Sequence, residues 1–285
     1  MNVLAVSRDH PETLFAAPSV AAERRADGSI LLKSTTPLQP YARCVGDWLE
    51  HWARQAPERI FLGERFSVEA PWTAITYRDA LRQVRSAGAW VLSQGMTAAR
   101  PLVVLSDNSI EHALFALGAL HVGVPVASIS PAYSLMSKDF DKLKGMIALL
   151  DPGAIYMSST EGFAPALAAV KPLHSAVIVS ADGARHANSF RKIAATLEAN
   201  AVEKAFAAIT PDTIAKFLFT SGSTGTPKAV INTQRMLTSS QQARAQTWPF
   251  LDGMQDLVIL DWLPWSHTFG ANHNFNLVLR NGGTL

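Results

Sequence analysis

Two apolar segments enclose a polar loop in the stretch Lys216-Phe217-Leu218-Phe219, Thr220-Ser221-Gly222-Ser223-Thr224-Gly225-Thr226-Pro227-Lys228, Ala229-Val230-Ile231. Glycines let a backbone approach a ligand closely, and successive N–H groups of such a loop can form an anion-binding nest. Four hydroxyl side chains before Gly225 add hydrogen-bond donors, and Lys228 adds a full positive charge. The stretch therefore predicts a strand, a polyphosphate-binding loop and a second strand.

Two well-known loops do not fit these residues. A Walker A loop has four residues between its first glycine and Gly-Lys, with Ser or Thr after the lysine. Here Gly222 and Gly225 are three apart, and Ala229 follows the lysine. A nucleophile elbow needs Gly-x-Ser-x-Gly, but Ser221 occupies the first glycine position around Ser223. The simplest alternative is a flexible surface loop that ends in a solvated lysine.

Short apolar runs alternate with helical patterns over most of the chain. Apolar residues recur at helical spacing from Val45 to Trp52. Thr76 and Asp79 form a capping-box pattern that opens a helix to about Leu92. The other predicted elements are strands at 101–105, 124–129, 154–157, 175–179, 214–219 and 257–261, and helices at 109–121, 137–150 and 189–199. This alternation predicts an α/β fold, with layered and largely parallel sheets flanked by helices.

The chain divides at about residue 40. Residues 1–40 hold four prolines and a polar turn at 26–28, which predicts an irregular N-terminal arm before a domain over 41–285. At the other end, 280–283 form a turn signal, and Thr284-Leu285 has the pattern of a new strand. Because a domain should not end by opening an element, we expect the domain to be truncated.

Composition excludes several classes of protein. The 285 residues are 48% hydrophobic and 17% charged, with a net charge of +2 and no basic tract that predicts nucleic-acid binding. The lone Cys44 cannot form an internal disulfide, which fits a reducing cytoplasm, and its surroundings favour a buried thiol over a reactive one. The most apolar stretch, 114–129, is too short and interrupted to span a membrane.

The loop resembles the signature of the adenylate-forming superfamily, which includes acyl-CoA synthetases, adenylation domains and luciferases. Glycine usually follows the lysine there, so Ala229 is a mild departure. A second stretch, Leu263-Pro264-Trp265-Ser266-His267-Thr268-Phe269-Gly270, resembles the next motif of that superfamily. The resemblance makes His267 a wall of the acid pocket, whereas taken alone it would be a packed core histidine. His267 and His273 are six apart, a poor spacing for zinc, and we expect no metal ligands.

Further sequence segments narrow the resemblance to the feruloyl-CoA synthase branch. They include the runs 215–219, 231–237, 248–251, 261–265 and 273–276, and the early Pro40-Tyr41 with Trp48, Leu49 and Trp52. This resemblance extends from about residue 30 to the last residue. The alternative within enzymes is a medium-chain or other aryl acyl-CoA synthetase. The aromatic residues Trp262, Trp265 and Phe269 favour a planar acid only weakly.

The resemblance implies an AMP-forming acid–CoA ligase that uses ATP, Mg²⁺ and coenzyme A. A carboxylate attacks the α-phosphorus of ATP, and the CoA thiol then attacks the acyl adenylate. The nucleotide would be bound by Thr220, Ser221, Gly222, Ser223, Thr224, Gly225, Thr226 and Lys228, with Lys228 and His267 also serving catalysis. The protein would promote the attack on ATP mainly by positioning the reactants and by neutralising charge.

Several superfamily features are not found in this sequence. They are a Tyr-Gly-x-Thr-Glu stretch, a ribose-binding Asp, a hinge and a small C-terminal domain with a catalytic lysine. We therefore expect poor turnover. Two non-enzymatic hypotheses stay open: a regulatory nucleotide-binding protein and a non-catalytic interaction fragment.

Overall fold

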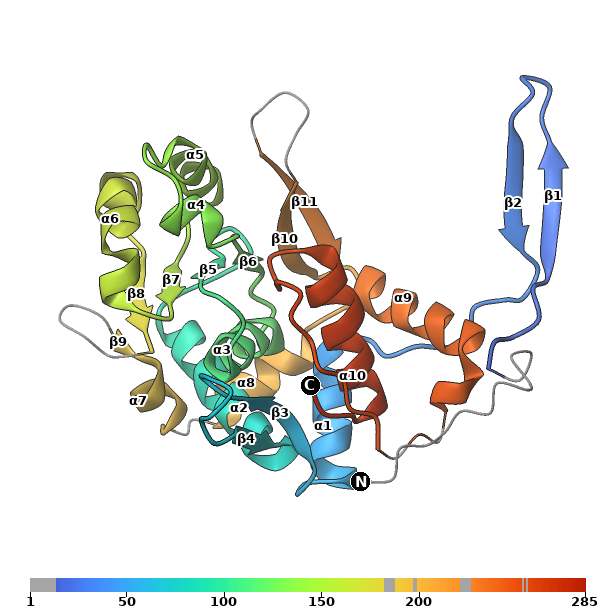
Figure 1. Cartoon of the computed structure of the whole chain (residues 1–285), viewed down its shortest axis with the longest axis horizontal. Coiled ribbons are helices and arrows are strands. Elements are labelled where there is room, and N and C mark those ends of the chain that lie inside the picture. Colours follow the sequence, from blue (N-terminus) through green and yellow to red (C-terminus); the bar gives the residue numbers. More distant parts are fainter. Residues whose placement is uncertain (1–13, 182–187, 197–198, 221–226, 253, 255) are drawn as a thin grey trace.

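The computed structural model describes residues 14–181, 188–196, 199–220, 227–252, 254 and 256–285 (Figure 1). Its strands are β1 (Val20–Arg24), β2 (Ile30–Ser34), β3 (Ile60–Glu64), β4 (Thr73–Thr76), β5 (Leu102–Leu105), β6 (Val126–Ser128), β7 (Ala154–Met157), β8 (Val177–Ser180), β9 (Asn188–Ser189), β10 (Ile214–Thr220) and β11 (Lys228–Thr233). Its α-helices are α1 (Val45–Gln55), α2 (Tyr77–Ser93), α3 (Ile110–His121), α4 (Ala132–Leu135), α5 (Asp141–Leu150), α6 (Thr160–Val170), α7 (Phe190–Ala194), α8 (Ala199–Ala207), α9 (Gln234–Thr247) and α10 (Phe275–Asn281). Short 3₁₀ turns cover Lys171–Leu173 and Pro249–Leu251, and a π-helix, η4, covers Phe269–Asn274.

In the described part of the chain, seven strands form one sheet in the order β11-β10-β6-β5-β7-β8-β9. All neighbours are parallel except β10 and β11, which form an antiparallel pair at one edge. Residues of β5 and β7 are buried without exception, as expected for parallel strands that are covered on both faces. The predicted α/β fold with a largely parallel sheet is confirmed.

Helices cover both faces of this sheet (Figure 1). Leu102 and Val104 of β5 pack in one apolar core with α2 and α3, whereas Val103 and Leu105 pack in the other with α5 and α6. Successive residues of a strand point to opposite faces, so a four-residue apolar strand serves both cores. The predicted capping at Thr76 is also present, because its Oγ1 accepts a hydrogen bond of 3.2 Å from the Asp79 backbone N–H.

Four expectations need correction. The arm is not irregular throughout, because β1 and β2 form a hairpin that projects from the body (Figure 1) and turns at Gly28, whose φ is +87°. Stretch 257–261 forms no strand of the sheet but a single bridge between Val258 and Thr284. In the region 189–199 the first helix ends at Ala194, and the separate α8 follows. The helix expected at 137–150 begins at Asp141, after the short α4. These differences share a cause: pairing partners and tertiary packing decide where a short apolar run begins and ends.

The last two residues close a small sheet-like contact beside β3. The Leu285 N–H donates to the Phe61 carbonyl, and the Gly63 N–H donates to the Leu285 carbonyl, each over 2.9 Å. Among the described residues, no helix combines the length and apolar character that crossing a membrane requires. The division of the chain at residue 40 stays a prediction.

Candidate active site

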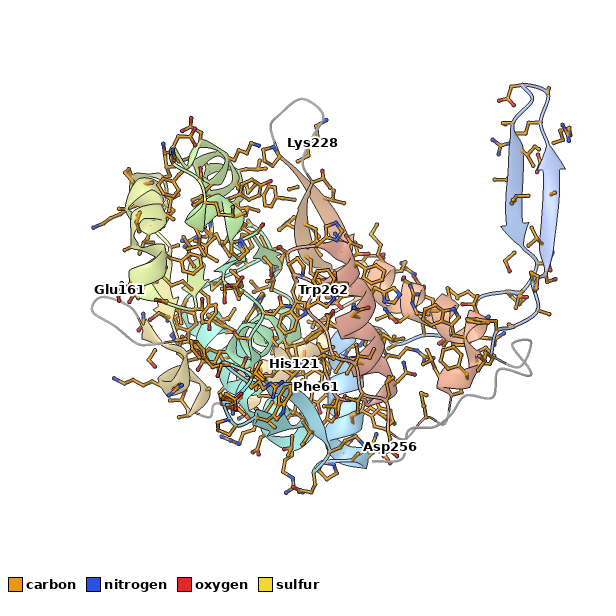
Figure 2. All side chains as sticks on the ribbon, viewed as in Figure 1. Phe61, His121, Glu161, Lys228, Asp256 and Trp262 are labelled. Carbon is orange, nitrogen blue, oxygen red and sulfur yellow. The ribbon has the colours of Figure 1, made fainter. Side chains whose placement is uncertain are left out.

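The two ends of the polyphosphate loop lie side by side at the edge of the main sheet. Thr220 ends β10, Lys228 begins β11, and the two residues are direct ladder partners. Both side chains are exposed, and Figure 2 labels Lys228 at the start of β11. Residues 221–226, which lie between them in the sequence and belong to the predicted nucleotide site, are outside the described part of the chain. The structure thus confirms a strand on each side of the loop and brings Thr220 and Lys228 together.

The described part of β10 ends at Thr220, on the side of the sheet where the parallel strands β5, β6 and β7 also end. In open α/β sheets, ligands bind outside the carboxyl ends of strands, where the strand order reverses direction. The chain passes from β5 to β6 on one side and then to β7 on the other, so the reversal occurs at β5. This topology places the switch point between β5 and β7, at the same carboxyl edge of the sheet where β10 ends at Thr220.

Asn108, just beyond β5, holds the second motif over this edge. Its Nδ2 donates to the Leu263 carbonyl over 2.8 Å, and its Oδ1 accepts from the Trp265 N–H over 2.9 Å. The side chain therefore satisfies one acceptor and one donor of a segment more than 150 residues away in the chain. The predicted helix at 109–121 begins one residue later, so the role of Asn108 as a clamp was missed.

The second motif leads into the π-helix η4, a form that is rare and often found at functional sites. Gly270 is required here, because a Cβ atom at this position would lie 2.6 Å from the Leu263 carbonyl oxygen and 2.7 Å from that of Pro264. His267 precedes η4 and is exposed, with its Nδ1 accepting a long 3.4 Å hydrogen bond from the Phe269 N–H. His267 is therefore not the packed core histidine that the motif taken alone would suggest. Its place in an acid pocket stays a proposal.

The aromatic residues of this region do not form one wall. Trp262 is 84% exposed and Phe269 is 49% exposed (Trp262 is labelled in Figure 2). Trp265 instead packs edge-to-face against His112 and Phe275, with ring centroids 5.2 and 5.1 Å apart. Only Trp265 therefore belongs to the protein interior.

Lys216 lies beneath η4 and was missed as a site residue. Its Nζ donates to the Ala271 carbonyl over 3.1 Å and to Asn272 Oδ1 over 3.3 Å. Burial lowers the pKa of Lys216 to about 8. A lysine within an apolar strand was the available signal, because an inward-facing charge needs a reason. Asn272 in turn donates to Asn232 of β11 over 3.0 Å, which ties η4 to the strand after the loop.

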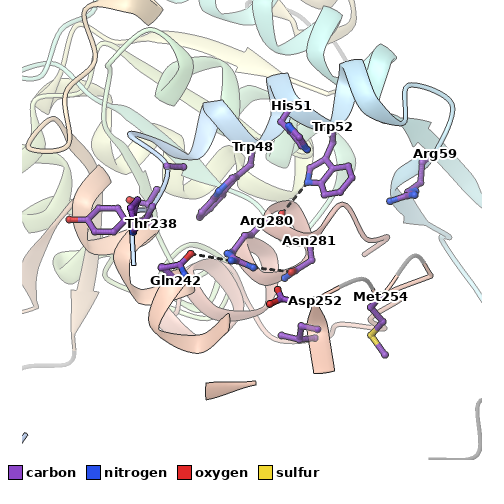
Figure 3. Close-up of a pocket in the computed structure, with 14 residues that line it drawn as sticks. Trp48, His51, Trp52, Arg59, Thr238, Gln242, Asp252, Met254, Arg280 and Asn281 are labelled. Carbon is purple, nitrogen blue, oxygen red and sulfur yellow. Dashed lines mark hydrogen bonds between the residues drawn. The ribbon is translucent and has the colours of Figure 1, made fainter. Parts of the chain in front are cut away.

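A hollow of about 860 Å³ lies away from these residues, between α1, α9 and α10 (Figure 3). Several of its polar groups have partners within the chain. Arg280 donates to Gln242 and Asn281 over 3.1 and 3.0 Å, and Trp52 donates to the Arg280 carbonyl over 3.0 Å. Its lining includes no residue of β10, β11 or the second motif. Size alone therefore does not make it the active site.

Metal ligation finds no support in the described ranges. No three His, Cys, Asp or Glu side chains in them come together to hold an ion. His273 stacks on Phe269 with centroids 4.5 Å apart, and its Nδ1 lies 2.8 Å from Asn274 Oδ1. His273 thus makes aromatic and amide contacts.

Two solved structures share this fold. A fatty acyl-adenylate ligase from L. pneumophila, solved with acyl adenylate and pyrophosphate, aligns with a TM-score of 0.65 at 18% identity, covering 85% of this chain and 39% of that one. ATP-bound MatB from Rhodopseudomonas palustris aligns with a TM-score of 0.61 at 20% identity, covering 83% of this chain and 44% of that one.

Two curated relatives are CoA ligases. A long-chain fatty acid–CoA ligase of Mycobacterium bovis is 26% identical over 175 residues, which is 60% of this chain and 28% of the relative. 4-Coumarate–CoA ligase 3 of Oryza sativa subsp. japonica is 27% identical over 213 residues, 74% of this chain and 36% of the relative. The chain thus spans well under half of either relative.

The family model described as AMP-binding enzyme matches residues 49–285, so the chain belongs to the AMP-binding enzyme family. The predicted superfamily is confirmed by this match. The finer resemblance to feruloyl-CoA synthases stays a proposal.

Proposed function

We propose that this chain supplies the nucleotide-binding and acid-binding part of an AMP-forming acid–CoA ligase that acts on ferulate or a related aryl acid. The observation that carries the proposal is the pairing of Thr220 with Lys228 at the carboxyl edge of a parallel sheet. Family membership over residues 49–285 and the sequence of the loop between these residues support it. Medium-chain or other aryl acids are the alternative substrates.

In this proposal the loop from Thr220 to Lys228 binds the β- and γ-phosphates of ATP. Lys228 neutralises charge that builds on pyrophosphate as the carboxylate attacks the α-phosphorus. His267 forms one side of the acid site, and the CoA thiol then takes the acyl group from AMP. Two observations fit a phosphate ligand: Lys228 is exposed, and it has Thr220 as its immediate neighbour. Because the described residues provide no cluster of metal ligands, Mg²⁺ would enter on the phosphates of the nucleotide.

Nucleotide binding tests the first part of the proposal. Lys228→Ala should weaken ATP binding, measured by calorimetry, by roughly tenfold to a hundredfold, because a hydrogen bond to a charged group contributes about 1.5–3 kcal/mol. Lys33→Ala is the matched control, since Lys33 is an exposed lysine on the projecting hairpin. Equal ATP affinities of wild type and Lys228→Ala would refute the assigned role and favour an interaction fragment.

Acid dependence tests the second part. Exchange of pyrophosphate into ATP by this chain should be weak, should depend on ferulate and should fall further in Lys228→Ala, whereas robust ferulate-dependent exchange would refute the expectation of poor turnover. ATP binding with no response to ferulate, medium-chain acids or other aryl acids would instead favour a regulatory nucleotide-binding protein. A response to medium-chain acids alone would replace ferulate by the alternative substrate class.

A further inference from the structure

Two side chains from outside η4 bind three of its successive carbonyl groups. Lys216 Nζ donates to the Ala271 carbonyl over 3.1 Å. Gln241 Nε2 donates to the carbonyls of Asn272 and His273 over 2.8 and 3.2 Å. Gln241 belongs to α9 and is only 1% exposed. The π-helix is therefore anchored to β10 through Lys216 and to α9 through Gln241.

Asn272 links η4 to both strands that carry the polyphosphate loop. Its Oδ1 accepts from Lys216 Nζ over 3.3 Å, and its Nδ2 donates to Asn232 Oδ1 over 3.0 Å. Lys216 of β10 and Asn232 of β11 are ladder partners, and the side chains of directly opposite residues lie on the same face of a sheet. One amide group thus spans the ladder and uses both its oxygen and its nitrogen.

The ladder pair that holds Asn272 lies at equal distance along both strands from the loop. Lys216 is four residues before Thr220, and Asn232 is four residues after Lys228. At about 3.3 Å per residue, the pair is roughly 13 Å from the two ends of the loop. Every residue in between has a ladder partner, so the sheet itself sets this distance. A group bound by the pair therefore keeps a fixed separation from the loop.

The same contacts reach His267 through a single residue. The Ala271 N–H donates to the His267 carbonyl over 3.0 Å, while the Ala271 carbonyl accepts from Lys216. The His267 N–H donates in turn to the Pro264 carbonyl over 3.0 Å. The exposed His267 side chain thus takes its position from backbone that Lys216 and Asn272 hold in place.

Lys216 is a costly residue to use for packing alone. Its partners are neutral, and none of its described contacts is with a carboxylate. Burial lowers the pKa of Lys216 to about 8, because the charged form loses hydration that no counter-charge replaces. Its neighbours in β10 are apolar, and an apolar residue in its place would avoid this cost. The lysine is therefore better explained by the contacts that it makes with η4.

We propose that Lys216 and Asn272 are positioning residues, which hold His267 at a set distance from the loop between Thr220 and Lys228. This inference rests on the proposed function, which places the acid beside His267 and ATP at the loop. Both positioning residues act through the backbone of η4. Their effect is to keep a bound acid in register with the phosphates of ATP, as attack on the α-phosphorus requires.

Asn272→Ala tests the positioning role while it keeps the charge of Lys216. Affinities of the whole chain for ferulate and for ATP are measured by calorimetry. Asn272→Ala should weaken ferulate binding by about fivefold or more and change ATP binding by no more than about twofold. Asn281→Ala is the matched control, because Asn281 is also half-buried, accepts from Arg280 over 3.0 Å and donates to the Leu277 carbonyl over 2.8 Å. It should change neither affinity by more than about twofold.

A cycle with His267→Ala separates positioning from a merely structural role. In that background the group to be positioned is absent, so Asn272→Ala should change ferulate affinity by less than about twofold. An equal loss in both backgrounds would show that Asn272 acts independently of His267 and would overturn the inference. Equal ferulate affinities of wild type and Asn272→Ala would overturn it as well.

Lys216→Met decides the matter even if Asn272→Ala does not fold. It removes the donor to the Ala271 carbonyl, while Gln241 still holds the next two carbonyls of η4. Ferulate affinity should fall by about fivefold or more, and an unchanged affinity would count against the inference. A wild-type chain that binds no ferulate refutes the proposed acid site and the inference with it. A wild-type chain that binds ferulate no more tightly than the variants refutes the positioning role alone.

Discussion

Replacing Glu50 by glutamine should remove most of a pH-dependent contribution to stability that is built into α1. The Glu50 side chain is only 9% exposed, and its Oε1 accepts from Arg85 Nη2 over 2.6 Å and from Nε over 3.1 Å. Arg54 donates to Oε2 over 3.3 Å, and His121 Nε2 lies 3.5 Å from Oε1. Together these contacts join α1, α2 and α3.

The pKa of Glu50 sets the size and the direction of the effect. Burial by itself raises this pKa, but hydrogen bonds and charges from His121 and Arg85 outweigh it and lower the pKa from 4.5 to about 2. That difference corresponds to about 3 kcal/mol of unfolding free energy. Because the pKa is lower in the folded state, the contribution is present above about pH 4.5 and is lost as the pH falls toward 2.

Urea unfolding of wild type and Glu50→Gln at several pH values between 7 and 3 measures this contribution. The difference in unfolding free energy should be about 3 kcal/mol at pH 7 and should shrink steadily below pH 4.5. Glu58→Gln is the matched control, since Glu58 also lies 2.6 Å from an arginine, Arg78, but with side chains 72% and 61% exposed. Exposed pairs contribute about 0–1 kcal/mol. A Glu50→Gln difference that is equally large at pH 7 and pH 3 would refute the reasoning.

Two further predictions concern packing and reactivity. Gly118→Ala should lower the unfolding free energy by about 1–3 kcal/mol, because its Cβ would lie 2.5 Å from Ala87 Cβ at the contact of α2 and α3. Gly145→Ala, in α5 with open space around it, should instead be neutral or stabilise the protein by up to about 1 kcal/mol, and equal effects of the two changes in thermal unfolding would contradict this packing argument. Cys44 is fully buried, and burial together with the Asp47 charge raises its pKa to about 12. A thiol reagent at pH 7 should therefore modify Cys44 only after denaturation, and rapid modification of the native chain would show that the thiol is accessible.

Local patterns predicted the elements that carry strong local signals. The Thr76–Asp79 pair predicted the start of α2, and the apolar run at 154–157 predicted β7 with its observed bounds. Weak local signals gave wrong boundaries. Residues 257–261 are apolar enough for a strand, but their available partner is Thr284 near the end of the chain, so a single bridge forms.

The sequence alone determined the type of fold, the family and the position of the loop between two strands, because those depend on residue periodicity and on nine consecutive residues. The tertiary structure decided which strands are neighbours and, through them, that Lys216 of β10 and Ser128 of β6 lie close to Asn276 of α10. Period-two alternation tells which residues of one strand share a face. It does not tell which strand pairs beside it, since that choice is made by contacts between residues far apart in the chain. The contacts of Lys216 with η4 follow from that packing, and so they became visible only in the folded chain.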